Sequence, residues 1–259
     1  MKKLGVAFFL FSVFLSCKKQ EKELTNSNIT PPSSSTGSIT VKFENYSGAN
    51  PLVLNTFDYV NANGDTFKVS LFNYYISNIK LIAADSSIYS ESESYHLIQA
   101  DLNSSLQFSL PNIPIKNYVA IQLTIGVDSL RNVSGAQSGA LDPVNGMFWS
   151  WNSGYIMAKI EGTSPQSGQS SKLLKFHVGG FSGVNNSIRT LRLAFPNTAN
   201  VSSSTTPVLT LKADVLEWFK SPSTINFATT HTVHMPGAAA KIIADNYSDM
   251  ISVSSVQNP

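Results

Sequence analysis

Cysteine is almost missing from this 259-residue chain, which contains only Cys17. A single cysteine excludes a disulfide within the chain. Because Cys17 lies so close to the N-terminus, a thiolate metal site or a cysteine nucleophile in the body of the chain is excluded as well. Lipidation would explain an isolated cysteine in an exported protein.

Charge is also scarce, since only 13% of the residues are charged and the formal net charge is +2. Cleavage of a leader that carries Lys2 and Lys3 would reduce that charge to zero. This composition has neither the basic footprint of a nucleic-acid-binding protein nor a polybasic patch for anionic lipid. We therefore expect no nucleic-acid partner.

The familiar enzyme motifs are absent. The chain has no GxSxG elbow, no HExxH helix, no Walker loop and no GxGxxG after a strand. No serine or aspartate is spaced from a histidine as a catalytic triad would require, and spacing alone does not join Asp128, Asp142 and Glu161 into an acid–base pair. The sequence therefore predicts a protein that is not an enzyme.

The N-terminus has the pattern of a secretory signal. Lys2 and Lys3 precede residues 4–16, which carry no charge and are rich in Phe, Leu and Val, and Cys17 follows. The apolar run is shorter than the about 20 residues that a membrane-spanning helix needs. We interpret residues 1–16 as a lipoprotein signal peptide and Cys17 as the lipidated residue, although Phe14 stands where leucine is usual. An ordinary signal peptide with a chance cysteine is the alternative.

This interpretation predicts a protein of the bacterial cell envelope, anchored by lipid to the outer membrane and either periplasmic or surface-exposed. Residues 17–37 would be the lipidated cysteine and a flexible tether, because they are first charged and then rich in Ser, Thr and Pro. Residues 38–259 would form a single domain.

That domain shows the alternation of β-strands. Apolar and polar residues alternate with period two in several short runs, which indicates half-buried strands; these are residues 39–44, 67–72, 119–125, 173–178, 188–193 and 208–213, with further candidates at 74–83 and 155–161. We predict an all-β fold, an antiparallel β-sandwich of roughly seven to nine strands. A short C-terminal helix is expected within residues 238–248.

An aromatic segment interrupts this pattern. Met147, Trp149 and Trp151 are spaced two apart, so their side chains would share one side of an extended chain. They end a long irregular stretch, residues 127–152, and such loops are usually functional or disordered. Two interpretations stay open: a hydrophobic plug over the sandwich, since buried tryptophans mostly serve packing, or a functional loop.

Four histidines are the remaining candidates for chemistry. His177 ends a predicted strand and runs into two glycines, His231 and His234 lie beside Met235, and His96 belongs to another predicted strand. Imidazole and thioether groups suit copper where thiols are missing. A spacing of three places His231 and His234 on one face only in a helix or tight turn. The alternative is that each histidine is a hydrogen-bonded structural residue.

The chain resembles the MbnP-like family, which includes the MopE/CorA-type copper-binding proteins. The most specific matching blocks are FWSWNSGY at 148–155 and FHVGG at 176–180. The other matching stretches are residues 72–80, 95–98, 126–128, 139–143, 146–147, 160–162 and 244–250. The resemblance implies a periplasmic or surface β domain that binds copper.

In characterised members of that family, histidines and kynurenine, an oxidised tryptophan, hold Cu(I). A di-haem partner of the MbnH type is thought to perform the oxidation. By this resemblance Trp149 or Trp151 is the candidate oxidised ligand, and His177 is the first histidine ligand. Met147 and Met235 are possible thioether ligands.

The resemblance leaves the second histidine open. Close family sites can have a histidine near the tryptophan, but none stands between residues 139 and 175 here. His231, His234 and His96 are the remaining choices. We expect a lipoprotein that captures or delivers copper without turning over a substrate. The alternative is a structural or ligand-recognition module of the same fold that has lost the metal site.

Overall fold

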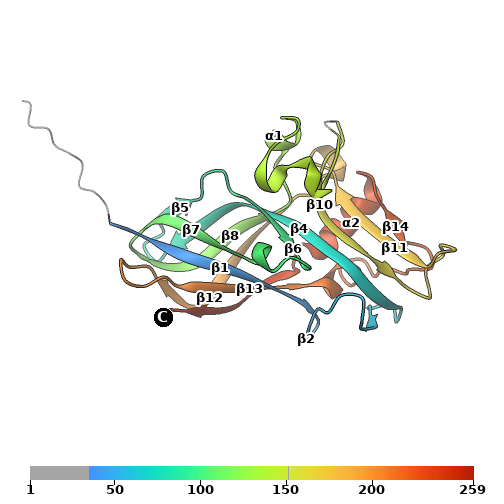
Figure 1. Ribbon diagram of the computed structural model, residues 1–259, viewed down its shortest axis with the longest axis horizontal. Helices are drawn as coiled ribbons and strands as arrows, with labels where there is room; N and C mark the ends of the chain where they lie inside the picture. Colours follow the sequence, from blue (N-terminus) through green and yellow to red (C-terminus); the bar gives the residue numbers. More distant parts are fainter. Residues whose placement is uncertain (1–34, 151) are drawn as a thin grey trace, which may run out of the picture. The chain divides into compact units, whose positions relative to one another are not determined.

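The fold consists of two β-sheets packed face to face (Figure 1). The computed structural model describes residues 35–150 and 152–259. The predicted signal peptide, Cys17, most of the tether and Trp151 lie outside these described residues. The all-β prediction is confirmed; most predicted strands are longer than the sequence pattern indicated, and several short strands are added to them.

The smaller sheet has the order β15-β13-β1-β2, and β7 also pairs with β1. Its strands are β1 (Thr36–Ser47), β2 (Asn50–Pro51), β7 (Gln107–Pro114), β13 (Val208–Asp214) and β15 (Ile251–Gln257).

The larger sheet has the order β12-β8-β4-β10-β11-β14. The predicted strands at 67–72 and 74–83 are one continuous strand, β4 (Thr66–Ala83). The others on this path are β8 (Asn117–Ile125), β10 (Gly154–Thr163), β11 (Leu173–Gly179), β12 (Arg189–Asn200) and β14 (Thr232–Val233). Short strands flank it: β3 (Tyr59–Val60), β5 (Ile88–Ser90) and β6 (Tyr95–Gln99) beside β4, and β9 (Phe148–Ser150) beside β10.

Two strand pairs depart from the predicted antiparallel arrangement. β1 runs parallel to β13, and β11 runs parallel to β14. In both cases the chain passes through other elements before it returns, as a parallel pair requires. The remaining pairs are antiparallel.

The main core lies between the sheets, where each strand contributes every second residue. Phe43 of β1 meets Tyr74 of β4 with ring centroids 6.0 Å apart. Near β11, η5 (Val215–Phe219) and α2 (Ala238–Tyr247) pack against the core-facing side of the large sheet. Phe176 of β11 packs on Phe219 there, at 5.3 Å. The C-terminal helix is therefore confirmed as part of the core, at the right of Figure 1.

The irregular stretch before β10 is built from short helical turns that lie over the outer face of the large sheet, at the top of Figure 1. They are α1 (Ser129–Asn132), η2 (Gly139–Leu141) and η3 (Pro143–Asn145); the other turns are η1 (Asn103–Ser105) and η4 (Gly183–Asn185). A second hydrophobic cluster lies beneath them and includes Met147, Tyr155 and Met157.

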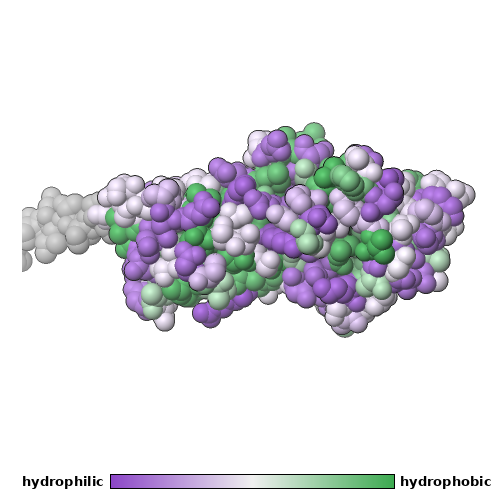
Figure 2. All heavy atoms as spheres, turned by 90° about the horizontal axis from the view of Figure 1, so that it is seen from below, coloured by the Kyte–Doolittle hydropathy of each residue, from purple (hydrophilic) through white to green (hydrophobic). Residues whose placement is uncertain are grey.

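The surface of the domain mixes polar and apolar residues. Figure 2 shows separate hydrophobic patches among hydrophilic ones on the face that it presents. Within the described part of the chain, no helix has both the length and the apolar character that crossing a membrane requires.

Candidate metal site

The candidate site lies on the outer face of the large sheet, where β10 and β11 pair. Alternation sends Ile160 and Phe176 into the main core. The residues next to them, Lys159, Glu161 and His177, therefore face outward. Lys159 and His177 are directly paired across the two strands, so their side chains are neighbours.

His177 is held by a carboxylate. Its Nε2 lies 2.6 Å from Oε1 of Glu161, and its side chain is 12% exposed. Since a carboxylate only accepts hydrogen bonds, Nε2 carries the proton that is shared with Glu161. Nδ1 has no hydrogen-bond partner among the residues that the structure describes. The imidazole is thus fixed in orientation while Nδ1 remains available as a ligand atom.

The surroundings shift both pKa values of this pair. Burial lowers the pKa of His177 below its ordinary value, and the positive charges of Lys159 and Lys175 act in the same direction, against the opposing hydrogen bond from Glu161. Burial raises the pKa of Glu161, but the hydrogen bond from His177 and nearby positive charges outweigh it, so this pKa is lowered overall. At neutral pH the pair is therefore a neutral imidazole beside a carboxylate, the state in which imidazole binds metals.

Trp149 lies against the strand that carries His177. A Cβ atom placed on Gly179 would come within 2.5 Å of Trp149 Cζ3, so only glycine leaves room for the ring. Gly179 is two residues after His177 in β11, which puts both on the same face of the sheet. The structure thus brings Trp149 and His177 to adjacent positions on one surface.

The segment around Trp149 is fixed from below by buried groups. Met147 is fully buried in the second hydrophobic cluster, with Trp149 packed at its margin. Asn132 is also fully buried; its Nδ2 donates to the carbonyl groups of Val127 and Asp128, and its Oδ1 accepts from the Tyr155 amide at 2.7 Å. Packing therefore determines how this segment lies, as expected for a hydrophobic plug over the sandwich.

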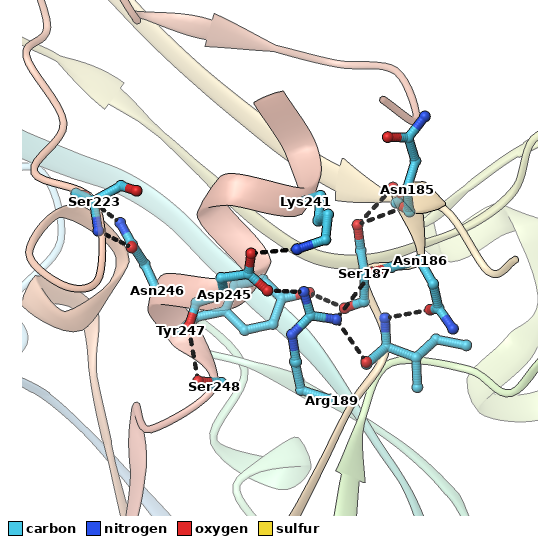
Figure 3. Close-up of polar contacts among 12 residues, drawn as sticks. Asn185, Asn186, Ser187, Arg189, Ser223, Lys241, Asp245, Asn246, Tyr247 and Ser248 are labelled. Atoms are coloured by element: carbon cyan, nitrogen blue, oxygen red, sulfur yellow. Dashed lines mark hydrogen bonds and ion pairs between the residues drawn. The ribbon is translucent and has the colours of Figure 1, made fainter. Parts of the chain in front are cut away.

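The turn after His177 is held by α2 (Figure 3). Tyr247 donates its hydroxyl proton to the Ser187 carbonyl at 2.8 Å. Ser187 in turn donates from Oγ to the Gly179 carbonyl at 3.0 Å. Arg189 and Asp245 form an ion pair between β12 and the same helix. These contacts fix the position of Gly179, and therefore the surface on which the Trp149 ring packs.

His234 reaches the same face from the neighbouring strand. β14 runs parallel to β11, with Lys175 opposite Thr232 and Phe176 opposite Val233. His234 follows directly after β14, and continued alternation from the buried Val233 puts it on the outward side, the side of His177. His234 is exposed and lines a shallow cavity of about 190 Å³ with Gln169, Leu173, Lys175 and Thr232. Met235, which follows it, is 55% exposed.

The other two histidines lie elsewhere. His231 is half-buried, with Nδ1 3.2 Å from the Phe227 carbonyl oxygen. His96 stacks on Phe108 of the smaller sheet, at 3.5 Å between centroids, and its Nε2 is 3.0 Å from each carboxylate oxygen of Glu91. His96 therefore points between the sheets, on the face opposite His177, and the structure does not bring the two together.

Among the described residues, no group of three or more His, Cys, Asp and Glu side chains stands close enough to hold a metal. In the sequence, Glu161 is one of three isolated carboxylates, and nothing predicts a role for Lys159. The alternation of polar residues with Ala158 and Ile160 in β10 does indicate that Lys159 and Glu161 share the outward face of that strand. Asp128 accepts from Tyr95, and Asp142 caps η3, so neither joins Glu161.

Comparison with known proteins agrees with this architecture. The sequence profile of the MbnP family matches residues 36–236. MbnP from Methylosinus trichosporium has a similar structure, with a TM-score of 0.56 at 13% sequence identity, over 86% of this chain and 99% of that chain. At this identity the structural likeness shows a shared fold, and no curated protein sequence matches the chain. Because the family profile covers well over half of the sequence, this chain belongs to the MbnP family.

Proposed function

We propose that this MbnP family protein binds copper on the outer face of β10, β11 and β14, and captures or delivers the metal without turning over a substrate. The observation that carries the proposal is the His177–Glu161 pair beside Trp149. In metal sites a ligating histidine usually gives its other ring N–H to a carboxylate, which fixes the tautomer and raises its basicity. Glu161 has that relation to His177.

The donor chemistry fits copper. His177 presents Nδ1, and His234 and Met235 follow directly after the neighbouring strand β14. Imidazole and thioether donors favour copper, whereas calcium and magnesium require several oxygen ligands. A structural zinc site would require four ligands, and the described residues do not bring together even three of the usual His, Cys, Asp and Glu donors. Bound copper would supply a redox-active ion, and the chain's own residues would orient it.

Trp149 is the candidate third donor. Indole offers no lone pair in the ring plane, so Trp149 would become a ligand only after oxidation to an aryl amine such as kynurenine. The proposed oxidant is a di-haem partner of the MbnH type. Peptide mass spectrometry of protein from its own host tests this step. An unmodified Trp149 and Trp151 would remove it and leave a site with histidine and thioether ligands.

Copper titration of the purified protein tests the main proposal. We expect about one copper ion per chain, as a single imidazole pair supports. His177→Ala and His234→Ala should each weaken binding strongly, and His96→Gln should not, because His96 faces the other side of the sheet. Copper uptake that is unchanged in His177→Ala would remove the proposal.

A recognition module is the second candidate. Among the described residues, the most exposed aliphatic side chains belong to the short turns α1, η3 and η4, with Val144 85%, Val184 84% and Leu130 75% exposed. Such side chains suit contact with a macromolecule. Two results together would favour this second function over the first. The wild-type protein would take up no copper, and a Val144→Ser/Val184→Ser double variant would lose a macromolecular partner that the wild type binds.

A further inference from the structure

Lys159 holds a central place on the outer face of the large sheet. It pairs with His177 on one side and with Asn73 of β4 on the other. All three side chains therefore lie in one row across the strands. The Lys159 side chain is only 14% exposed, which is unusual for a lysine.

Among the described residues, Glu161 is the ionic partner of the Lys159 ammonium group, and the contact is long. Its Nζ lies 3.7 Å from Glu161 Oε1 and 3.4 Å from the Gly146 carbonyl oxygen. The same Glu161 oxygen is already 2.6 Å from His177 Nε2. In this row, Asn73 is 4% exposed and its Oδ1 has no hydrogen-bond partner among the described residues. Lys159 thus places a positive charge on the strand next to the imidazole, close to the carboxylate that holds it.

The positive charge of Lys159 repels a cation bound at His177, and the repulsion energy is proportional to the charge of that cation. Coulomb repulsion by a fixed positive charge is twice as large for a divalent ion as for a monovalent ion at the same place. Lys159 also offsets the negative charge of the Glu161 carboxylate beside the imidazole. Without Lys159 the carboxylate would attract a divalent ion more strongly than a monovalent one.

We propose that Lys159 is a specificity-determining residue that biases the site toward monovalent Cu(I) and against divalent ions such as Zn(II). This inference rests on the proposed copper function and adds the basis of its selectivity. Lys159 acts through its charge, and it is not itself a ligand.

The test compares Cu(I) and Zn(II) dissociation constants of the full-length protein, measured by competition with chromophoric chelators at low ionic strength. Lys159→Gln removes the charge and keeps a polar side chain of similar size. Lys159→Arg keeps the charge. Lys116→Gln is the control, because Lys116 lies between β7 and β8 and pairs with Asp85, apart from the His177 and Glu161 pair.

Lys159→Gln should raise affinity for Zn(II) relative to Cu(I) by on the order of tenfold, as expected for the loss of one nearby positive charge. Lys159→Arg should keep the wild-type ratio, and so should Lys116→Gln. An unchanged ratio in Lys159→Gln, with Cu(I) still bound, overturns the inference and leaves the copper function in place. Wild-type protein that binds no Cu(I) overturns the copper function and, with it, this inference.

Discussion

Trp149 lies so close to Gly179 that the ring occupies the space in which any other residue at position 179 would place its side chain. This contact joins the aromatic segment to the strand that bears His177. It explains why the FHVGG block requires a glycine at its fourth position. The fifth, Gly180, has a φ of +120°, a conformation that side chains disfavour.

Gly179→Ala should displace the Trp149 ring. The added methyl group would lie 2.5 Å from Cζ3 of Trp149 and 2.9 Å from the Tyr155 carbonyl oxygen. We expect a loss of about 1–3 kcal/mol in the free energy of unfolding, typical of overpacking, together with a red shift of tryptophan emission and weaker copper binding. Urea unfolding and fluorescence measure these effects.

Gly237→Ala is the control for that substitution, because nothing lies within 4 Å of the position where its Cβ would stand. It should leave tryptophan emission unchanged. If Gly179→Ala were as silent as Gly237→Ala, the packing of Trp149 on β11 would be wrong.

The His177–Glu161 pair should make stability depend on pH. His177 has a lowered pKa when folded, so below its ordinary value near 6.5 the unfolded chain takes up the proton first. The free energy of unfolding should therefore fall as the pH drops through the range between the ordinary pKa and the folded pKa. The lowered pKa of Glu161 adds a further loss below its ordinary value near 4.5.

Urea unfolding of metal-free protein between about pH 7.5 and 5 tests this prediction for His177. His177→Gln should flatten the curve in that range, because it removes the titrating group. His234→Gln is the matched control, since His234 is exposed and should leave the slope as in wild type. A slope that survives in His177→Gln would contradict the burial of this imidazole.

Tyr247→Phe should weaken the support of the turn after His177. The substitution removes the hydroxyl that donates to the Ser187 carbonyl and leaves that buried acceptor without its partner. A cost of about 1–3 kcal/mol in the free energy of unfolding is expected. Hydrogen exchange should also speed up in residues 179–187, because Ser187 holds the Gly179 carbonyl.

Tyr89→Phe is the comparison for that change. Tyr89 makes the same kind of bond, to the Pro111 carbonyl at 3.0 Å, but at an exposed position. Water can replace its hydroxyl, so the cost should be clearly smaller. Equal costs for the two variants would mean that burial of Tyr247 does not matter to its hydrogen bond.

Much of the fold could be predicted from the sequence because alternation is a local signal. The runs around Val41, Ile121, Phe176 and Leu211 all form strands as predicted, and the C-terminal helix begins at Ala238. The parallel pairing of β1 with β13 could not be predicted, since period two gives the faces of a strand but not its neighbour or direction.

The candidate site was only partly predictable, for the same reason. The sequence pointed to His177, His234 and Trp149 separately, but spacing along the chain cannot show that β14 lies beside β11. It also cannot show that His96 faces the opposite side of the sheet. Glu161 and Lys159 look like ordinary solvated residues until pairing of β10 with β11 places them beside the imidazole.

X-ray absorption at the copper edge tests the central claim most directly, with protein loaded with a single equivalent of Cu(I) and then desalted. The proposal predicts nitrogen scatterers near about 2.0 Å and the multiple-scattering pattern of imidazole, which should diminish in both His177→Ala and His234→Ala. Copper that washes away from wild type, or an imidazole signal of the same strength in His177→Ala, would contradict it.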